Sequence, residues 1–502
     1  MSAVRIELLP LAKVLELEEG TPLQDLLFAQ GVEFPCGGRG RCQGCRVRVV
    51  GGELPITEED RRLLAPDRLA AGWRLACRAR ARAGLRLELA QWETAVLADD
   101  SHFPFTPRPG LGIAVDLGTT TVVAQLLDLH RGHVLAVRVG LNAQARHGAD
   151  LMSRIDFAST AAGAQTLCRL IREQVGALLA DLLATGSGRA ETLREVVLVG
   201  NTVMHHLFCG LSVEPLSRHP FETAQGGPQQ FAPAALGWEL PSTTAVHFLP
   251  CLGSFVGSDI LAGILATGLH ESPALGVLID LGTNGEIVVG NRDRLLCAST
   301  AAGPAFEGAR ISMGMRAATG AIAEVTVRDG QACCRVLGNT TPRGLCGSGL
   351  VDAATVGLEL GWIQPSGRLA NGGTLCLAPP VTLTQADIRE LQLAKGAIAA
   401  GIRLLLSQWG ADANDVTVVH LAGAFGNYIN RASARRIGLI RFPPERVRAA
   451  GNTALLGAKL ALFGLPTHGT AFADLRRRTR HVPLNEDARF HETFVAEMPF
   501  PA

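Results

Sequence analysis

Four cysteines near the N-terminus have the types and the spacing of a metal-ligand set. Cys36, Cys42 and Cys45 lie in one loop in the pattern C-x5-C-x2-C, and Cys77 follows much further along the chain. Three thiolates from one loop and a fourth from a distant segment are suited to hold the two irons of a [2Fe–2S] cluster. Structural zinc sites, the alternative, usually pair two C-x2-C units, and this segment has only one. We therefore predict that these four cysteines ligate a [2Fe–2S] cluster that carries single electrons.

The cysteine loop is also rich in glycine and arginine. Its glycines allow backbone conformations closed to other residues, which turn N–H groups toward the cluster sulfurs. The five-residue first interval resembles that of adrenodoxin-like ferredoxins rather than the plant type. Two interpretations of the arginines stay open, since their charge either stabilises a reduced cluster and docks an acidic redox partner or forms a solvated surface. These arginines are Arg39, Arg41, Arg46, Arg48, Arg74, Arg78 and Arg80.

Strand-like segments around this loop predict a small unit over residues 1–93. VRIELL, KVLELEEG, CRVRVVGGEL and LRLELA read as strands, and TPLQDLLFAQG has a helical pattern with Thr21 as its N-cap and Pro22 at the first helical position. The order of strand, strand, helix, cysteine loop and strand resembles a β-grasp ferredoxin. Residues 94–110 carry three prolines and no periodicity, so we expect a linker there.

Two similar segments further along the chain predict a phosphate site. GIAVDLGTTTVVAQL at 112–126 and GVLIDLGTNGEIVVG at 276–290 each place an Asp-Leu-Gly-Thr turn between two strands. Glycine lets the backbone of such a hairpin approach phosphate oxygens, and threonine adds hydroxyl donors. Asp116 and Asp280, at the strand ends, are suited to hold Mg²⁺ through water. The phosphate-binding candidates are Gly118, Thr119, Thr120 and Thr121 in the first copy and Gly282, Thr283, Asn284 and Gly285 in the second.

The repeat indicates a duplicated α/β fold after the linker. Strand-like runs such as EVVLVGN and VTVVHLAG alternate with alanine- and leucine-rich helical stretches such as DIRELQLAKGAIAAGIRLLLSQWG. Several of the strands are continuously apolar, which is typical of strands buried on both faces. We expect one lobe over residues 111–270 and a second over 271–465. Residues 466–502 are polar and arginine-rich, and we expect a lobe edge or a loosely packed tail there.

These motifs resemble those of the ATPase superfamily that includes acetate kinase, sugar kinases, Hsc70 and actin. DLGTTT and DLGTNG resemble its two phosphate motifs, and VVHLAGAFGNYI resembles its adenosine motif. The resemblance implies a duplicated actin-like, RNase H-like fold that binds ATP. It also implies that Asp116 and Asp280 organise Mg²⁺ and the attacking water, and that Gly423 and Gly426 line the adenosine pocket. No GxxxxGK[ST] motif is present, so a P-loop ATPase is excluded.

A ferredoxin unit joined to this ATPase fold resembles the reductive activators of corrinoid proteins. LVGNTVMHHL, AGPAFEGARISMGMRA, GLCGSGLVD and LAGAFGNYINR carry this resemblance, which extends from the cysteine loop to about residue 460. It implies an ATP-hydrolysing electron-transfer protein that reduces Co(II) to Co(I) on a corrinoid protein or a cobalamin-dependent methyltransferase. It further implies a low-potential electron donor upstream and suggests a homodimer.

The redox chemistry explains why such a protein needs ATP. Plant-type [2Fe–2S] clusters have potentials of about −400 mV, and the resemblance implies a still lower potential for the Co(II)/Co(I) couple. Each ~59 mV for one electron changes the equilibrium constant tenfold. The transfer is therefore unfavourable unless ATP binding or hydrolysis is coupled to it.

Three alternative functions make different demands on the sequence. Activators of 2-hydroxyacyl-CoA dehydratases share the ATPase fold, but their cluster is a [4Fe–4S] held between two subunits, which the C-x5-C-x2-C unit argues against. A small-molecule kinase with a fused redox module would need a sugar or acyl pocket and a catalytic base, for which no motif is evident. A non-catalytic scaffold would bind ATP without turnover.

Composition narrows the protein class. The net charge of +1 favours neither nucleic acid nor an anionic membrane surface. The first twenty residues place acidic side chains where a secretory signal would be apolar, and no stretch of about 18 apolar residues is free of charge. Twelve cysteines in 502 residues do not form a disulfide framework. We expect a soluble, cytoplasmic protein.

Several residues keep two interpretations at this point. Asn201 and Glu307 are either polar cleft residues or structural ones. His205 and His206 invite a metal-ligand interpretation, but neighbouring helical positions point apart, so we expect one packed and one exposed side chain. Cys297, Cys333, Cys334 and Cys346 lack clustered spacing, which favours structural thiols over a second cluster.

Overall fold

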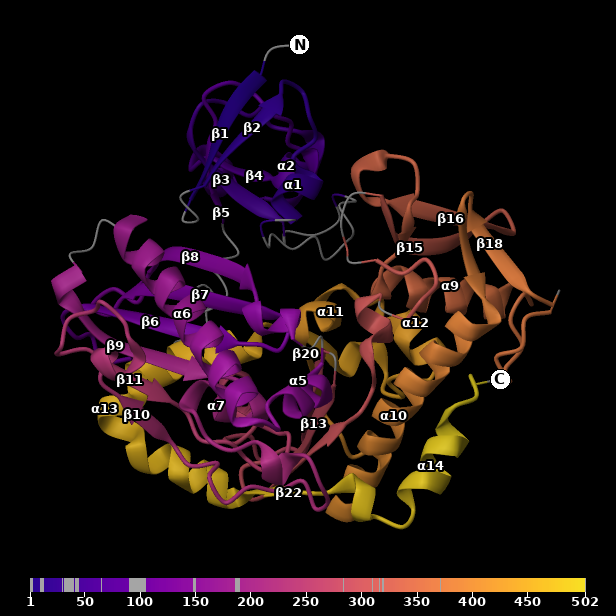
Figure 1. The fold of residues 1–502 in the computed structure, drawn as a ribbon. Coiled ribbons are helices and arrows are strands. Elements are labelled where there is room, and N and C mark those ends of the chain that lie inside the picture. The colour runs from indigo at the N-terminus through magenta and orange to yellow at the C-terminus, as the bar shows by residue number, and fades with distance from the viewer. Residues whose placement is uncertain are drawn as a thin grey trace.

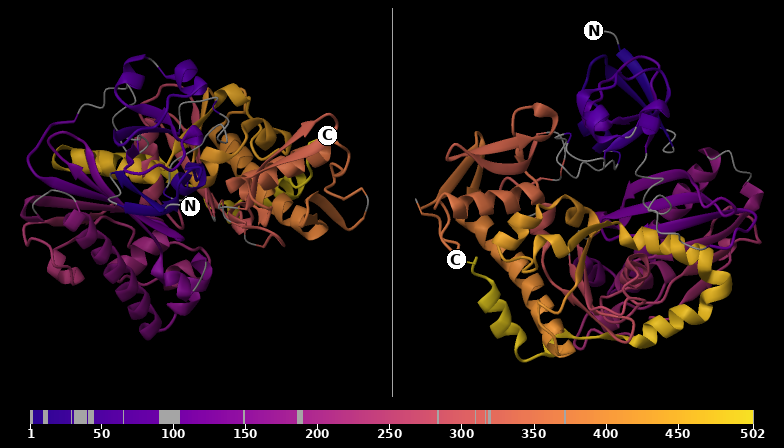
Figure 2. Two further views of the ribbon diagram at one scale, coloured as in Figure 1. Left: turned by 90° about the horizontal axis from the view of Figure 1, so that it is seen from above. Right: turned by 180° about the vertical axis from the view of Figure 1, so that it is seen from behind.

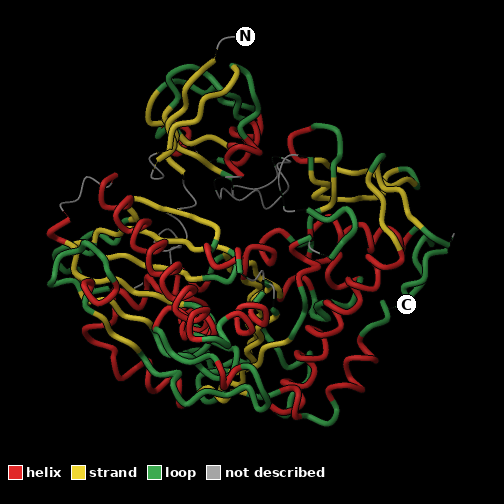
Figure 3. Tube along the Cα trace, viewed as in Figure 1, coloured by secondary structure: helices red, strands yellow, loops and turns green. Residues whose placement is uncertain are grey.

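The computed structural model describes residues 3–9, 13–28, 30, 40, 45–64, 66–89, 105–147, 150–185, 190–282, 284–308, 310–315, 317, 320–370 and 372–501. Within these ranges the chain forms an N-terminal sheet and two larger α/β lobes (Figure 1). Helices cover the outer faces of the sheets in both lobes (Figure 3). Among the helices described, none combines the length and the apolar character that crossing a membrane requires.

The N-terminal unit is a five-stranded sheet in the order β2-β1-β5-β3-β4. Its strands are β1 (Ala3–Leu9), β2 (Lys13–Glu18), β3 (Arg46–Gly51), β4 (Trp73–Leu75) and β5 (Arg86–Leu89). Val4, Ile6 and Leu8 alternate into the core because successive side chains of a strand point to opposite faces. The short helices are α1 (Gln24–Phe28), α2 (Glu58–Leu63), α3 (Pro66–Ala70) and the 3₁₀ turn η1 (Ala76–Arg78).

The start of α1 differs from the expectation. The Thr21 hydroxyl donates to the Glu18 carbonyl oxygen (2.7 Å) instead of capping the helix. Pro22 lies in a β-bridge with Arg80, so the helix begins at Gln24. The pairing with a distant segment outweighs the local capping signal. Gly31, the expected end of this helix, lies outside the described residues.

The first lobe is built on a six-stranded sheet in the order β10-β11-β9-β6-β7-β8. Its strands are β6 (Leu111–Leu117), β7 (Thr121–Asp128), β8 (Val134–Leu141), β9 (Leu193–Val199), β10 (Gln229–Phe231) and β11 (Ala245–Phe248). Its helices are α5 (Leu151–Phe157), α6 (Ala161–Thr185), α7 (Thr202–Cys209) and α8 (Ser258–Thr267). The first three strands are antiparallel, and β9 and β11 run parallel to β6.

The second lobe repeats this arrangement in the order β21-β20-β12-β13-β14-β22. Its strands are β12 (Gly276–Leu281), β13 (Gly285–Gly290), β14 (Leu295–Thr300), β20 (Val418–Ala422), β21 (Val447–Gly451) and β22 (Thr479–His481). Its helices are α9 (Gly347–Glu359), α10 (Gln385–Trp409), α11 (Gly423–Tyr428), α12 (Arg431–Arg436), α13 (Thr453–Arg478) and α14 (Phe490–Glu497). Two small sheets contain β15 (Ala321–Arg328), β16 (Gln331–Val336) and β17 (Gly344–Leu345), and β18 (Thr374–Ala378) and β19 (Val381–Thr384). The predicted duplication of an α/β fold is confirmed.

The two large sheets share a core formed around α8 and α13. Ile113, Val115 and Leu117 pack under α6 and α7, whereas Ala114, between them, faces the shared core. Leu278 of β12 reaches the same shared core. Both central strands are therefore buried on two faces, as their continuous apolar sequence predicts.

Helix α13 joins the lobes by crossing from one to the other. It follows β21 of the second sheet yet packs against β6 and β9 of the first, along the back of that lobe in Figure 2. It crosses α8 closely, since a Cβ at Gly457 would lie 2.0 Å from the Ala262 carbonyl oxygen. The helix also runs through the domain boundary expected at residues 465 and 466.

The C-terminal residues are packed rather than loose. β22 pairs with β14 at the edge of the second sheet, and α14 lies along α10. The fully buried Lys395 of α10 donates to the Pro499 carbonyl oxygen (2.7 Å). Residues 479–501 therefore form a lobe edge, which was one of the two expected arrangements.

Candidate nucleotide site and cluster ligands

Asp116 and Asp280 occupy equivalent positions in the two sheets. Asp116 lies near the end of β6, and Asp280 near the end of β12. The negative charge of Asp116 raises the pKa of Asp280, so the two carboxylates share one electrostatic field. Asn452, the N-cap of α13, donates from Nδ2 to Asp116 Oδ2 (2.8 Å). The duplicated hairpins thus bring together the two aspartates that the repeat singles out.

Two further carboxylates join this pair, and neither was predicted. Asp259 lies in the first turn of α8, and Glu286 lies on β13 directly opposite Asp280. The only local signals were an acidic residue at the start of an apolar helix and a polar residue inside the strand GEIVVG. Their proximity depends on the pairing of β12 with β13 and on the position of α8, which local sequence does not encode.

The four carboxyl groups have raised pKa values. Withdrawal from water is the main cause in every case, raising the pKa of Asp116 to about 6, Asp280 to about 7 and Asp259 to about 8. The pKa of Glu286 also lies well above its usual range, from burial and then from the charges of Asp259 and Asp280. These four residues are called the acidic cluster below. A site of this kind suits a divalent cation, whose charge favours the ionised carboxylates.

The donors fit Mg²⁺ held through water. Among the described residues, no three His, Cys, Asp or Glu side chains lie close enough together to ligate one ion directly. Mg²⁺ usually keeps several of its waters and uses few carboxylates, so it suits a cluster that reaches it partly through water.

The first hairpin is closed tightly at Gly118 and anchored at Thr119. The Gly118 N–H donates to the Thr121 carbonyl oxygen (3.0 Å), and a Cβ at Gly118 would lie 2.6 Å from that oxygen. Thr119 is held at two atoms, since Oγ1 accepts from Asn201 Nδ2 (2.9 Å) and its carbonyl oxygen accepts from Arg154 Nη2 (2.6 Å). Thr119, Thr120 and Thr121 stay partly accessible.

Asn201 serves both interpretations that the sequence left open. Its Oδ1 caps α7 by accepting from the Met204 N–H (3.0 Å), while its Nδ2 holds Thr119. Because Thr119 Oγ1 already accepts a hydrogen bond, its hydroxyl proton can be donated to a phosphate oxygen. The Glu307 side chain lies outside the described residues.

The two hairpins differ more in structure than in sequence. The Gly282 N–H donates to the Asn284 carbonyl oxygen (3.0 Å), and the Asn284 side chain bonds Glu286. A Cβ at Gly285 would lie 2.8 Å from Ile398 of α10, so this glycine is needed for packing. Thr283 lies outside the described residues.

Gly423 brings the adenosine-like segment against the acidic cluster. It begins α11 at φ +83°, and a Cβ there would lie 2.6 Å from Asp280 Oδ1 and from the Leu281 carbonyl oxygen. A side chain is therefore excluded both by backbone conformation and by space. At Gly426 a Cβ would lie 3.2 Å from the Leu421 side chain, which is a milder constraint.

Two of the four predicted cluster ligands lie in the described part of the chain. Cys45 is buried at the start of β3, and its carbonyl oxygen accepts from the Ala76 N–H (2.9 Å). Cys77 follows in η1, so the β3–β4 pairing sets the two cysteine segments side by side. Cys36 and Cys42 lie outside the described residues. The described pair fits a cluster held at this edge of the sheet.

The two histidines are structural, and the expectation that one is exposed is wrong. Both are fully buried on α7. His206 contacts the Thr202 carbonyl oxygen through Nδ1 (2.8 Å) and Thr223 Oγ1 through Nε2 (2.9 Å). His205 Nε2 contacts the Gly227 carbonyl oxygen (3.1 Å), and burial lowers its pKa to about 4.

The other cysteines also lie in packed surroundings. Cys297 belongs to the shared core, and Cys346 is buried at the N-cap of α9. Cys333 and Cys334 lie on β16. No group of three metal-binding side chains that includes any of them occurs among the described residues.

Comparison with protein families divides the chain into three matched segments. Residues 7–82 match the 2Fe-2S iron-sulfur cluster binding domain, residues 111–272 the RACo middle region, and residues 274–502 the C-terminal domain of RACo, the ASKHA domain. The three segments follow one another in the order that the motifs predict.

Individual relatives agree with these family matches. The chain is 36% identical over 428 residues to the corrinoid activation enzyme RamQ of Eubacterium limosum, covering 78% of this chain and 71% of the relative. It is 28% identical over 382 residues to the [Co(II) methylated amine-specific corrinoid protein] reductase of Methanosarcina barkeri, covering 69% of each. A solved structure, the reductive activator for corrinoid,iron-sulfur protein, aligns with a TM-score of 0.70 at 26% identity over 99% of this chain and 98% of that one.

Proposed function

Because the chain belongs to the family of reductive activators of corrinoid proteins, we propose that it is an ATP-dependent activator of this kind. It passes single electrons from a [2Fe–2S] cluster to the Co(II) form of a corrinoid protein or a cobalamin-dependent methyltransferase, and it restores Co(I). The names of the relatives support the cobalt couple, and the matched ferredoxin and ASKHA segments support the two cofactors.

The observation that carries this proposal is the proximity of Asp116 and Asp280, each of which comes from the hairpin of its own sheet. Two hairpins from duplicated sheets meet at one acidic cluster, on a chain whose N-terminal unit carries the cluster cysteines. A sugar kinase would share the acidic cluster but has no use for a ferredoxin unit. A simple ferredoxin would have no use for the acidic cluster.

At the nucleotide site, the residues bind phosphate and position water. The Thr119 hydroxyl donates to a phosphate oxygen, while Arg154 and Asn201 fix its position. Asp116 and Asp280 would hold Mg²⁺ through its waters, and the bound ion would offset the charge of the triphosphate. As an ionised carboxylate at this site, Asp280 would accept a proton from the attacking water.

At the N-terminal unit, Cys45 and Cys77 would ligate the cluster together with Cys36 and Cys42. The cluster supplies one-electron chemistry at low potential. We further infer that a low-potential donor reduces it and that the chain acts as a homodimer. Thiolate ligation rather than a disulfide framework favours the reducing cytoplasm.

Spectroscopy and a cobalt assay test the proposal together. The purified protein should be coloured, and with ATP, a strong reductant and a Co(II) corrinoid protein it should yield the absorbance of Co(I). A colourless, zinc-containing protein would show that the cysteines do not hold a [2Fe–2S] cluster. Phosphorylation of a metabolite without Co(I) from any corrinoid protein would favour the kinase alternative.

A further inference from the structure

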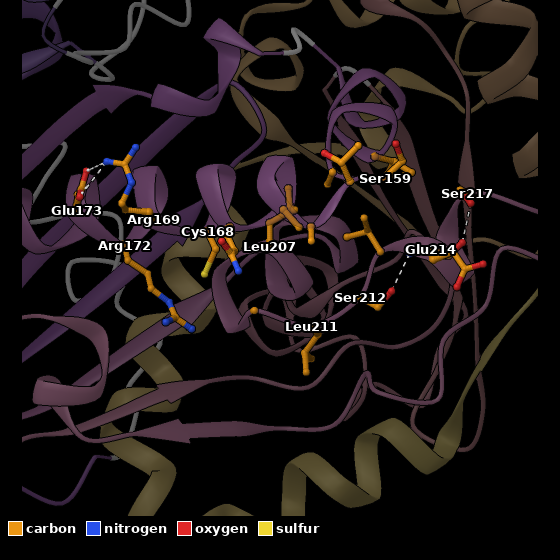
Figure 4. Close-up of a pocket in the computed structure, with 18 of the residues that line it drawn as sticks. Ser159, Cys168, Arg169, Arg172, Glu173, Leu207, Leu211, Ser212, Glu214 and Ser217 are labelled. Carbon is orange, nitrogen blue, oxygen red and sulfur yellow. Dashed lines mark hydrogen bonds and ion pairs between the residues drawn. The ribbon is translucent and has the colours of Figure 1, made fainter.

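A groove on the first lobe lies apart from the acidic cluster, none of whose residues lines it. It has a volume of about 1100 Å³ and lies between α5, α6, the end of α7 and the 3₁₀ turns η4 (Glu214–Leu216) and η5 (Pro233–Leu236) (Figure 4). Many of its lining residues are exposed, including Gln165, Ser212 and Ala235. It is an open groove rather than a closed cavity.

The open shape of the groove, rather than its size, favours a protein segment over a small molecule. Small-molecule pockets are usually about 300–1000 Å³ and enclose most of their ligand. An open groove with an apolar strip instead suits a helix or loop that lays down its apolar face. Half-buried Leu211 and the almost fully buried Leu207 form the apolar floor between two polar ends (Figure 4).

Both polar ends of the groove carry an arginine–glutamate ion pair, Arg169 with Glu173 and Arg218 with Glu214, and one end has a further arginine. At one end Arg169 pairs with Glu173 (3.0 Å), and Arg172 lies beside them. Arg172 donates to the Phe208 carbonyl oxygen (2.7 Å) and lies over the Phe208 ring, but it makes no ion pair within the described chain. The groove therefore offers a cation held in place by packing, which is complementary to an acidic side chain.

The groove and the nucleotide site share two helices. Helix α5 places Arg154 on the Thr119 carbonyl oxygen, and the next residue, Ile155, lines the groove. Helix α7 is capped by Asn201, which holds Thr119 Oγ1, and ends at the groove with Leu207 and the C-cap Gly210. Eight helical residues span only ~12 Å. A shift of either helix at the groove therefore acts on the phosphate hairpin.

We propose that this groove binds a segment of the corrinoid protein in which an acidic side chain flanks an apolar face, and that α5 and α7 couple this binding to Thr119. The inference rests on the proposed function and names the docking surface of its partner. Coupling of this kind is reciprocal, so the factor by which nucleotide changes partner affinity equals the factor by which partner changes nucleotide affinity.

A matched pair of tryptophan variants tests the groove. Ala235 and Ala234 are adjacent, exposed residues of η5, but only Ala235 lines the groove. Ala235→Trp should raise the Kd for the Co(II) corrinoid protein by about tenfold or more and abolish the effect of that protein on nucleotide affinity. Ala234→Trp should leave both within about twofold, and both variants should keep the basal ATPase rate. Equal partner binding by the two variants would overturn the proposal.

A charge pair at one position tests the chemistry of the segment. Gln165→Glu should weaken binding of the same Co(II) corrinoid protein, and Gln165→Lys should strengthen it, with a difference that shrinks as salt is raised. The same Kd for both variants would rule out an acidic segment. If the wild-type protein makes no Co(I), the proposed function fails. If it makes Co(I) and Ala235→Trp binds and responds as the wild type does, only the groove fails.

Discussion

At the residue scale, the acidic cluster predicts that ATP turnover depends on a divalent cation. Asp116 and Asp280 come from the repeat, while Asp259 and Glu286 are brought in by tertiary structure. Burial raises the pKa of all four groups, and nearby carboxylates raise those of Asp259, Asp280 and Glu286 further, so ionisation of the cluster is unfavourable until a cation binds. Two predictions follow from the raised pKa values of these carboxyl groups.

Removal of the negative charge of Asp280 should stop ATP turnover without affecting the [2Fe–2S] cluster. Asp280→Asn keeps the shape of the side chain but loses its charge, so ATP hydrolysis should fall by ~100-fold or more. The visible absorption of the iron–sulfur unit should stay unchanged because that unit folds on its own sheet. Asp293→Asn, on an exposed turn of the same lobe, should behave as the wild type. Undiminished ATP hydrolysis by Asp280→Asn would contradict the assigned role, whereas loss of its visible spectrum would indicate misfolding.

The stabilisation by Mg²⁺ should grow with pH. A carboxyl whose folded pKa is raised keeps its proton while the unfolded chain loses it, so its contribution to stability falls as pH rises from about 4 to its folded pKa. For Asp116, Asp280 and Asp259 that window ends at about 6, about 7 and about 8. Mg²⁺ relieves the ionised cluster and should raise Tm more at pH 8 than at pH 5. An equal rise at both pH values would argue against a cation at the cluster.

At the element scale, short helices connect the nucleotide hairpin to the rest of the first lobe. Asn201 caps α7 and holds Thr119, whereas Asn430 caps α12 and has no such contact. Asn201→Ala and Asn430→Ala should each lower the free energy of unfolding by ~1 kcal/mol. Only Asn201→Ala should also raise the Kd for ATP, measured by titration with a fluorescent nucleotide. A similar Kd for ATP in both variants would reduce Asn201 to a helix cap.

The crossing of α8 and α13 should be intolerant of even one methyl group. Gly457→Ala places a Cβ 2.0 Å from the Ala262 carbonyl oxygen, so the helices must separate, at a cost of ~1–3 kcal/mol. Gly396→Ala, in the middle of α10, meets only atoms at 3.3 Å or more, starting with the flexible Met498 side chain. It should be neutral or slightly stabilising in urea unfolding. If Gly457→Ala were equally neutral, the close crossing would be contradicted.

The elements also show what sequence can and cannot predict. The long helix α10 and the paired hairpins were predictable, because periodicity and repeated motifs are local signals. The crossing of α13 onto the first sheet was not, because it depends on packing between lobes. The same holds for Asp259 and for the burial of both His205 and His206, whose surroundings come from distant segments.

At the scale of the whole molecule, two chemistries lie on one chain. The N-terminal unit lies above the two lobes in Figure 1, and the lobes are joined through α8 and α13. Because α8 packs closely against α13 in the core that both lobes share, we expect nucleotide bound at the acidic cluster to act on both lobes. The groove on the first lobe gives the partner a position from which to sense that nucleotide.

The most direct test of the central claim is the ATP dependence of cobalt reduction. Reduced protein is mixed with a Co(II) corrinoid protein, with and without Mg²⁺ and ATP, and the Co(I) absorbance is followed. The account predicts that Co(I) accumulates only when reduced protein, Mg²⁺ and ATP are all present. Equal accumulation of Co(I) without ATP, or none while ATP is hydrolysed, would contradict it.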